Sequence, residues 1–235
     1  MPIETKRYMI LLEGNEYPII MPNIYSTEKF EKEFTYSGSD LGATYTPENY
    51  NVPEGSYSTD PYNGAVRVSE MKQMVKTLHD NQISVIMDVV YNHVYNASDF
   101  CVNQIVPGYF SRVDADGKYS NGSDCGNDTA SERSMVRKYI VDSVKYWADE
   151  YHIDGFRFDL MGLHDVATMN AIRSAMDDID TRILIYGEGW DMGTGLPAEQ
   201  KAKKDNAALM PRIGFFNDNA RDAVKGAEVY GYISN

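Results

Sequence analysis

Apolar side chains recur along this chain with spacings that alternate between helical and extended. Met71, Met74, Val75 and Leu78 lie three or four residues apart, or are adjacent, and predict a helix over about 66–80. A β-branched run at 83–90 follows, which is typical of a strand buried in a parallel sheet. The pattern then repeats. It predicts one helix capped by Ser131 or Ser134, another over about 169–179, and strands at 153–159, 182–186 and 213–216.

Two segments between these elements have the composition of loops. Residues 47–64 are rich in Pro, Asn, Gly, Ser and Tyr. Residues 95–133 form a long polar stretch, and loops of that length in a compact domain are usually functional. Residues 1–46 are weakly patterned, with short strands expected at 8–12 and 19–21 and a short helix at 26–34.

Strands that alternate with helices predict an α/β fold with a parallel sheet. The three best-defined strands each end in acidic or polar side chains, namely Asp88 and His93, Arg157 and Asp159, and Glu188 and Asp191. A TIM-type (β/α)8 barrel places its site at that face, and an open doubly wound sheet also binds ligands at its strand ends. No Gly-rich phosphate loop follows any of these strands, which favours the barrel.

Charge and composition narrow the range of partners. The formal net charge of −13 argues against nucleic acid and anionic membranes. No stretch approaches the ~20 apolar residues of a membrane helix, and the start lacks a signal peptide. We therefore expect a cytoplasmic protein, with a secreted parent protein as the open alternative. The sequence leaves open whether Cys101 and Cys125 pair, and it predicts no cofactor.

The polar strand ends suggest a specific chemistry. Arg157 and Asp159 are two residues apart, so on a strand their side chains point to the same face. They could form a structural ion pair, or they could take part in a reaction. If the strands that end in Asp159 and Glu188 are neighbours, they lie ~4.8 Å apart. Their carboxyl groups would then be separated by roughly the 5 to 5.5 Å of a retaining glycosidase. Arg157 would keep Asp159 ionised as the nucleophile, while burial and a like charge would raise the pKa of Glu188 as the acid/base.

Several segments resemble a known family. Residues 88–93 (DVVYNH), 155–159 (GFRFD) and the segment around Glu188 resemble the first three sequence regions of the α-amylase superfamily. Residues 50–58 (YNVPEGSYS), 187–191 (GEGWD) and 216–218 (FND) are similar to type I pullulanases, which cleave α-1,6 branch links in pullulan, starch and glycogen-derived glucans.

The resemblance implies a role for each residue of the site. Asp159 would be the nucleophile and Glu188 the general acid/base, in agreement with the electrostatic argument. His93 and Arg157 would hold the sugar, and Asp88 and Asn92 would support the site. For His93 taken alone, a structural histidine is the commoner case.

Two aromatic residues are further candidates for binding the glucan. Tyr50 could stack on a sugar ring, and Trp190 could bind the glucan. Tyr50 could equally pin its loop to the rim of a barrel. A second hypothesis from another class is a non-catalytic remnant that binds glucan through Tyr50, Tyr57, His93 and Trp190.

The resemblance also predicts how the chain is organised. Residues 1–48 are expected to be a remnant of the pullulanase N-terminal module, and 49–235 a partial catalytic barrel with about the third to sixth strands. The family's fourth sequence region, whose Asp stabilises the transition state, is absent. For the isolated chain, this favours the hypothesis of a non-catalytic remnant over that of an active hydrolase. Open barrel edges predict self-association. We expect no metal site, because Asp114, Asp116 and Asp124 are more typical of a solvated loop than of a calcium site.

Overall fold

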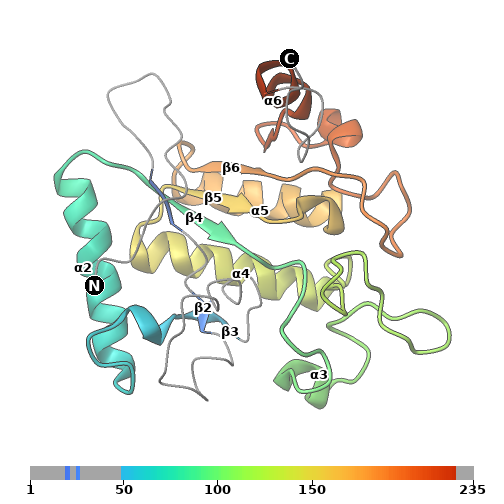
Figure 1. Cartoon of the computed structure of the whole chain (residues 1–235), viewed down its shortest axis with the longest axis horizontal. Coiled ribbons are helices and arrows are strands. Elements are labelled where there is room, and N and C mark those ends of the chain that lie inside the picture. The colour runs from blue at the N-terminus through green and yellow to red at the C-terminus, as the bar shows by residue number, and fades with distance from the viewer. Residues whose placement is uncertain (1–18, 22–24, 27–48, 226–235) are drawn as a thin grey trace.

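A parallel sheet forms the centre of the molecule, as the computed structural model shows for residues 19–21, 25–26 and 49–225 (Figure 1). Its five strands have the order β1-β4-β5-β6-β7, and every neighbouring pair is parallel. The strands are β1 (Ile19–Met21), β4 (Val85–Val89), β5 (Gly155–Phe158), β6 (Leu184–Gly187) and β7 (Gly214–Phe215). The prediction of an α/β fold with a parallel sheet is confirmed.

The three longest helices lie where the apolar periodicity predicts them, whereas two shorter helices were not predicted. They are α2 (Gly64–Asp80), α3 (Cys101–Ile105), α4 (Ser134–Tyr151), α5 (Val166–Ile179) and α6 (Asp218–Lys225), with 3-10 helices η2 (Gly55–Tyr57), η3 (Met161–Leu163) and η4 (Lys204–Leu209). Asp165 caps α5, because its side chain accepts a hydrogen bond from the Thr168 backbone N–H. The helices α4 and α5 run side by side along the sheet (Figure 1).

The loops contain more regular structure than the sequence predicts. The supposed loop 47–64 includes strand β3 (Asn49–Pro53), which pairs antiparallel with β2 (Tyr25–Ser26). The long segment 95–133 includes α3, whose five residues are too few to show a helical period. The prediction of Ser131 or Ser134 as the cap of α4 is wrong. Arg133 holds the N-cap position without a side-chain cap hydrogen bond, Ser134 is the first helical residue, and the Ser131 hydroxyl donates to Asp165. The predicted strand at 8–12, all but the first residue of the predicted helix at 26–34, and most of the predicted N-terminal module lie outside the described residues.

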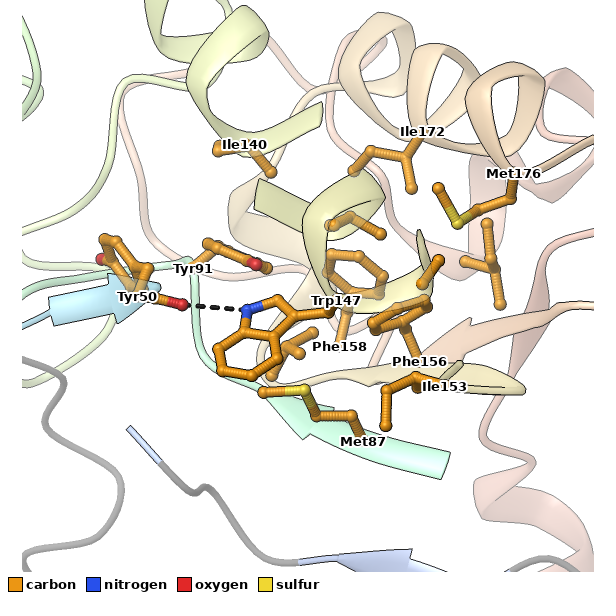
Figure 2. Packing of buried hydrophobic residues seen from close by; sticks show 14 of the residues in the cluster. Tyr50, Met87, Tyr91, Ile140, Trp147, Ile153, Phe156, Phe158, Ile172 and Met176 are labelled. Atoms are coloured by element: carbon orange, nitrogen blue, oxygen red, sulfur yellow. Dashed lines mark hydrogen bonds between the residues drawn. The ribbon is translucent and has the colours of Figure 1, made fainter. Parts of the chain in front are cut away.

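The core lies between the sheet and the helices α4 and α5 (Figure 2). Trp147 of α4 is fully buried and packs over the strand residues Met87, Phe156 and Phe158. Its indole Nε1–H donates to the backbone carbonyl of Tyr50 at 3.0 Å, which ties β3 to α4 (Figure 2). This face of the sheet therefore supplies the hydrophobic stabilisation of the fold.

The opposite face of the sheet carries the polar side chains. The register pairs Asp88 with Arg157 and Arg157 with Tyr186, so these three side chains point to the same side. The intervening residues Val89 and Phe158 point toward α4 and α5. The register thus separates an apolar face, which builds the core, from a polar face, which carries the candidate chemistry.

Candidate active site

The first residues after β5 and β6 lie side by side at the carboxyl edge of the sheet. Phe158 pairs with Gly187, and the Glu188 N–H donates to the Phe158 carbonyl at 3.1 Å. The Asp159 N–H donates to the Val89 carbonyl at 2.9 Å. The sheet hydrogen bonds therefore continue to Asp159 and Glu188 and fix both residues on neighbouring strands, as the sequence predicts.

Arg157 connects the three carboxylates of this edge. Its Nη1 donates to Asp88 Oδ1 at 2.8 Å and to Asp159 Oδ1 at 2.9 Å, and its Nη2 donates to Glu188 Oε1 at 2.5 Å. All four side chains are between 3% and 16% exposed. Because one guanidinium group reaches both Asp159 and Glu188, the two carboxyl groups lie close together on one side of the sheet.

Charge and burial set the proton affinities in this cluster. Burial by itself lowers the pKa of Arg157, but the charges of Asp88, Glu188 and Asp159 outweigh it and raise that pKa above its ordinary value. Burial raises the pKa of Glu188, and the charges of Asp159 and Asp88 add to the rise, against the lowering effects of Arg157 and of a hydrogen bond from the Leu160 N–H. A raised pKa suits a carboxyl group that must carry a proton near neutral pH.

Asn92 and His93 extend the cluster from β4. The Asn92 Nδ2 donates to the backbone carbonyl of Asp159 at 2.8 Å and to its Oδ2 at 3.0 Å. The His93 Nδ1 bonds the Asn92 Oδ1 at 2.5 Å, and because a carbonyl oxygen accepts, the imidazole proton lies on Nδ1. Asn92 therefore orients Asp159 directly, and His93, which is 2% exposed, orients Asn92.

The two aromatic candidates lie in different environments. Trp190 is 38% exposed and follows Glu188 by two residues, so it has surface for a ligand. Tyr50 is 1% exposed, its ring packs against Tyr91 with centroids 5.0 Å apart, and its hydroxyl donates to the His93 carbonyl. A ring enclosed in this way has no face for a sugar. The structure favours the alternative that Tyr50 pins its loop, and it corrects the expectation of direct stacking.

Several residues of the site were not predicted from the sequence. Leu160 has a left-handed backbone, with φ 41° and ψ 47°, and its N–H donates to Glu188 Oε2 at 3.0 Å. Tyr186 lies in the same register row as Arg157, and the Arg157 guanidinium lies 5.6 Å from the centre of the Phe216 ring. The resemblance includes Phe216 without giving it a role. No sequence pattern marks Leu160, because its contribution comes from the backbone.

Buried polar groups hold the long segment 95–133 beside the site. Arg112 is 5% exposed and forms a bidentate pair with Glu132, and its Nη2 also donates to the Leu163 carbonyl at 3.4 Å. The fully buried Asp128 accepts hydrogen bonds from the Ser120 hydroxyl and from the backbone N–H groups of Gly122 and Ser123. These bonds outweigh burial and hold the pKa of Asp128 below its ordinary value.

Other expectations concern cysteines, metals and membranes. Cys101 and Cys125 are free and exposed, so they do not pair. Within residues 19–21, 25–26 and 49–225, no three His, Cys, Asp or Glu side chains come together as metal ligands would. No helix in the described part of the chain is both long enough and apolar enough to cross a membrane.

Comparisons with known proteins find close relatives over most of the chain. It is 51% identical over 182 residues to the pullulanase of Bacillus subtilis (strain 168), and the match covers 77% of this chain and 25% of that protein. It is 37% identical over 204 residues to chloroplastic pullulanase 1 of Arabidopsis thaliana, and the match covers 80% of this chain and 21% of that protein. The chain thus spans about a quarter of the length of these relatives. No protein-family model matches it.

Solved structures show the same relationship. A crystal structure of the Paenibacillus barengoltzii pullulanase in complex with maltohexaose and α-cyclodextrin superposes with a TM-score of 0.83 and 50% identity. The match covers 89% of this chain and 32% of that one. The pullulanase of Anoxybacillus sp. LM18-11 in complex with maltotetraose matches with a TM-score of 0.83 and 45% identity, over 89% of this chain and 30% of that one.

Proposed function

Because this chain is homologous to a segment of the pullulanases, we propose that its strand-end site is that of a retaining glycoside hydrolase acting on α-1,6-glucosidic branch links. The substrates would be pullulan, starch or glycogen-derived glucans. A pullulanase that matches this chain binds maltohexaose and α-cyclodextrin in its crystal structure, which supports an α-glucan as the ligand.

One observation carries this proposal: Asp159 and Glu188 end neighbouring strands and share the guanidinium group of Arg157. Asp159 would attack the anomeric carbon and form a glycosyl ester as the branch-link C–O bond breaks. Glu188 would give its proton to the departing oxygen and then take a proton from the water that hydrolyses the ester. The raised pKa of Glu188, caused first by burial, fits the first step.

The finer description of the fold belongs to the same proposal. The strands β4, β5, β6 and β7 would be the third to sixth strands of a TIM-type barrel, with the site at their carboxyl ends. Their parallel order and the superposition on the P. barengoltzii pullulanase support this description. The strand β1 adds a neighbour on the other side of β4.

Hydrolysis of pullulan by the chain, followed through the release of reducing ends, tests the proposal. We expect Asp159→Asn and Glu188→Gln each to reduce kcat by about a thousandfold or more, as removal of a group essential to the reaction does. Asp205→Asn is the control, because the Asp205 side chain is 77% exposed and pairs with Lys203. Turnover that survives both active-site substitutions would refute the assignment.

The second candidate is a glucan-binding chain without turnover, which the exposed ring of Trp190 favours. Titration calorimetry with maltohexaose separates the two. Binding that Trp190→Ala weakens, in a chain with no reducing-end release, would support the binding protein and exclude the hydrolase.

A further inference from the structure

The backbone turns sharply directly after Asp159. Leu160 adopts the left-handed conformation, φ 41° and ψ 47°, which strains any residue with a Cβ atom. The short helix η3 (Met161–Leu163) follows, closed by hydrogen bonds from the Leu163 N–H to the Leu160 carbonyl and from the His164 N–H to the Met161 carbonyl. A leucine in this conformation persists only when its surroundings determine it, so the turn calls for a physical explanation.

The turn holds Glu188 through both its side chain and its backbone. The Leu160 N–H donates to Glu188 Oε2 at 3.0 Å, and the Gly162 N–H donates to the Glu188 carbonyl at 3.1 Å. The other carboxylate oxygen, Oε1, accepts from Arg157. Both oxygens of Glu188 are therefore bound by groups on one segment, the strand β5 and the turn that follows it.

Gly162 permits the close approach of the two segments. A Cβ atom on Gly162 would lie 1.8 Å from the carbonyl oxygen of Trp190, a distance that backbone atoms cannot share. The φ angle of Gly162 is not positive, so space rather than conformational freedom requires a glycine here. The turn thus contacts the segment 188–190 on its backbone as well as through the Glu188 carboxylate.

We propose that the turn 160–162 is a positioning element for Glu188, and that the left-handed conformation of Leu160 lets its N–H bind the Glu188 carboxyl group while the Gly162 N–H binds the Glu188 carbonyl. The inference rests on the proposed function, because it assigns the turn to the acid/base group. Since Leu160 is bonded covalently to Asp159, the same peptide unit also links the positions of the two carboxyl groups.

This arrangement has an electrostatic consequence that can be measured. Burial raises the pKa of Glu188, while Arg157 and the Leu160 N–H, which favour the carboxylate, lower it. Asp159, directly after β5, and Asp88 of β4 are the like charges that face it and raise that pKa. Loss of the Leu160 hydrogen bond therefore moves the Glu188 titration to higher pH.

Nuclear magnetic resonance of the whole chain tests the contact without any activity measurement. The amide resonance of Leu160 should titrate with the same midpoint as the 13C signal of the Glu188 carboxyl group, and Glu188→Gln should remove that titration. A Leu160 amide resonance that does not shift as Glu188 ionises would overturn the inference. The comparison of the two midpoints uses the unsubstituted chain, so it tests the contact even when a substituted chain fails to fold.

Two substitutions of Leu160 separate its backbone role from its side chain. Leu160→Gly keeps the N–H and tolerates the left-handed conformation, so the Glu188 midpoint should stay in place. Leu160→Ile keeps the volume, but its branched Cβ disfavours that conformation, so the midpoint should move to higher pH. Equal midpoints in both variants, with native circular dichroism, would contradict the inference.

The two proposals fail in different ways. A chain that releases no reducing ends from pullulan but shows the linked titration of Leu160 and Glu188 would refute the hydrolase and leave the positioning contact in place. An active chain in which the two signals titrate independently would refute the positioning contact alone. In an active chain, Leu160→Ile should also shift the alkaline limb of the kcat profile to higher pH, a change that general destabilisation does not produce.

Discussion

Arg157 gives the polar cluster its charge balance at the scale of single residues. Its guanidinium group faces Asp88, Asp159 and Glu188, each within 2.9 Å. Pairs this enclosed need not stabilise a fold relative to apolar residues, but removing one partner leaves uncompensated buried charge. The arrangement is therefore better explained by the chemistry of the carboxyl groups than by stability.

Substitution of Arg157 should be costly and dependent on pH. We expect Arg157→Met to lower the free energy of unfolding by about 3–5 kcal/mol at pH 7, because three carboxylates lose their cation. The loss should be smaller at pH 4 than at pH 7, because Glu188, whose pKa is raised by burial, gains its proton as the pH falls and no longer adds to the uncompensated charge. Urea unfolding at both pH values measures the effect.

Arg182→Met is the matched control for Arg157→Met. The Arg182 side chain is 89% exposed and pairs with Asp180 at the surface, so its removal should cost less than about 1 kcal/mol at either pH. A similar small cost for Arg157→Met would contradict the buried network.

Asp128 offers a test of linkage between protons and stability. Burial alone would raise its pKa, but hydrogen bonds from Ser120, Gly122 and Ser123 lower it below the ordinary value. A carboxyl group whose folded pKa is depressed contributes stability above its unfolded pKa and loses it as the pH falls through the folded pKa. We expect Asp128→Asn to cost about 1–3 kcal/mol at pH 7, with the difference narrowing below about pH 4.

Urea unfolding from pH 7 to pH 3 measures this effect. Asp114→Asn is the control in the same loop, because the Asp114 side chain also accepts backbone hydrogen bonds but is exposed. It should change stability by no more than about 0.5 kcal/mol. A difference between wild type and Asp128→Asn that is independent of pH would exclude the linkage.

At the scale of elements, α4 organises the packing of the strands. Trp147 is the largest fully buried side chain, and it contacts the sheet while it bonds the Tyr50 carbonyl of β3 (Figure 2). The helix therefore joins two parts of the chain that lie 97 residues apart. The candidate site depends on it indirectly, since the apolar residues of β5 that pack on α4 alternate with Arg157 and Asp159.

Truncation of Trp147 should show how much this joint contributes. We expect Trp147→Ala to destabilise the chain by about 3–5 kcal/mol, through the cavity and the lost hydrogen bond to Tyr50. Met135→Ala on the same helix should change stability by no more than about 0.5 kcal/mol, because Met135 is 60% exposed. Thermal unfolding of both variants makes the comparison, and equal effects would contradict the packing in Figure 2.

At the scale of the whole molecule, the sheet has strand β1 at one end and β7 at the other among the described residues. Its polar face also carries Leu184, which is 48% exposed. An unpaired strand edge and exposed apolar surface favour association between chains. Self-association therefore stays a prediction that the sheet supports.

Sedimentation velocity over a range of protein concentrations tests this prediction. We expect concentration-dependent association that Leu184→Lys weakens about tenfold, because it removes an apolar contact from the sheet face. Leu209→Lys is the control, since Leu209 is 53% exposed on η4 rather than on the sheet. A chain that stays monomeric at every concentration would refute the prediction.

The amino-acid sequence by itself determined the order of the elements and the chemistry at the strand ends. Helical and extended periods are local, so they predicted α2, α4, α5 and the strands β4 to β7 within a few residues. The candidate carboxyl groups, Asp159 and Glu188, could be named because each follows such a strand. Short elements such as α3 and β3 were missed, because their length gives no period.

Only the tertiary structure decided how these residues act on one another. Strand register brought Arg157 to three carboxylates from three strands, and burial set the direction of the Glu188 pKa shift. Packing against Tyr91 enclosed Tyr50, and the approach of the Glu188 segment gave Leu160 its partner. These properties depend on contacts between residues far apart in the chain, which no local pattern of side chains contains.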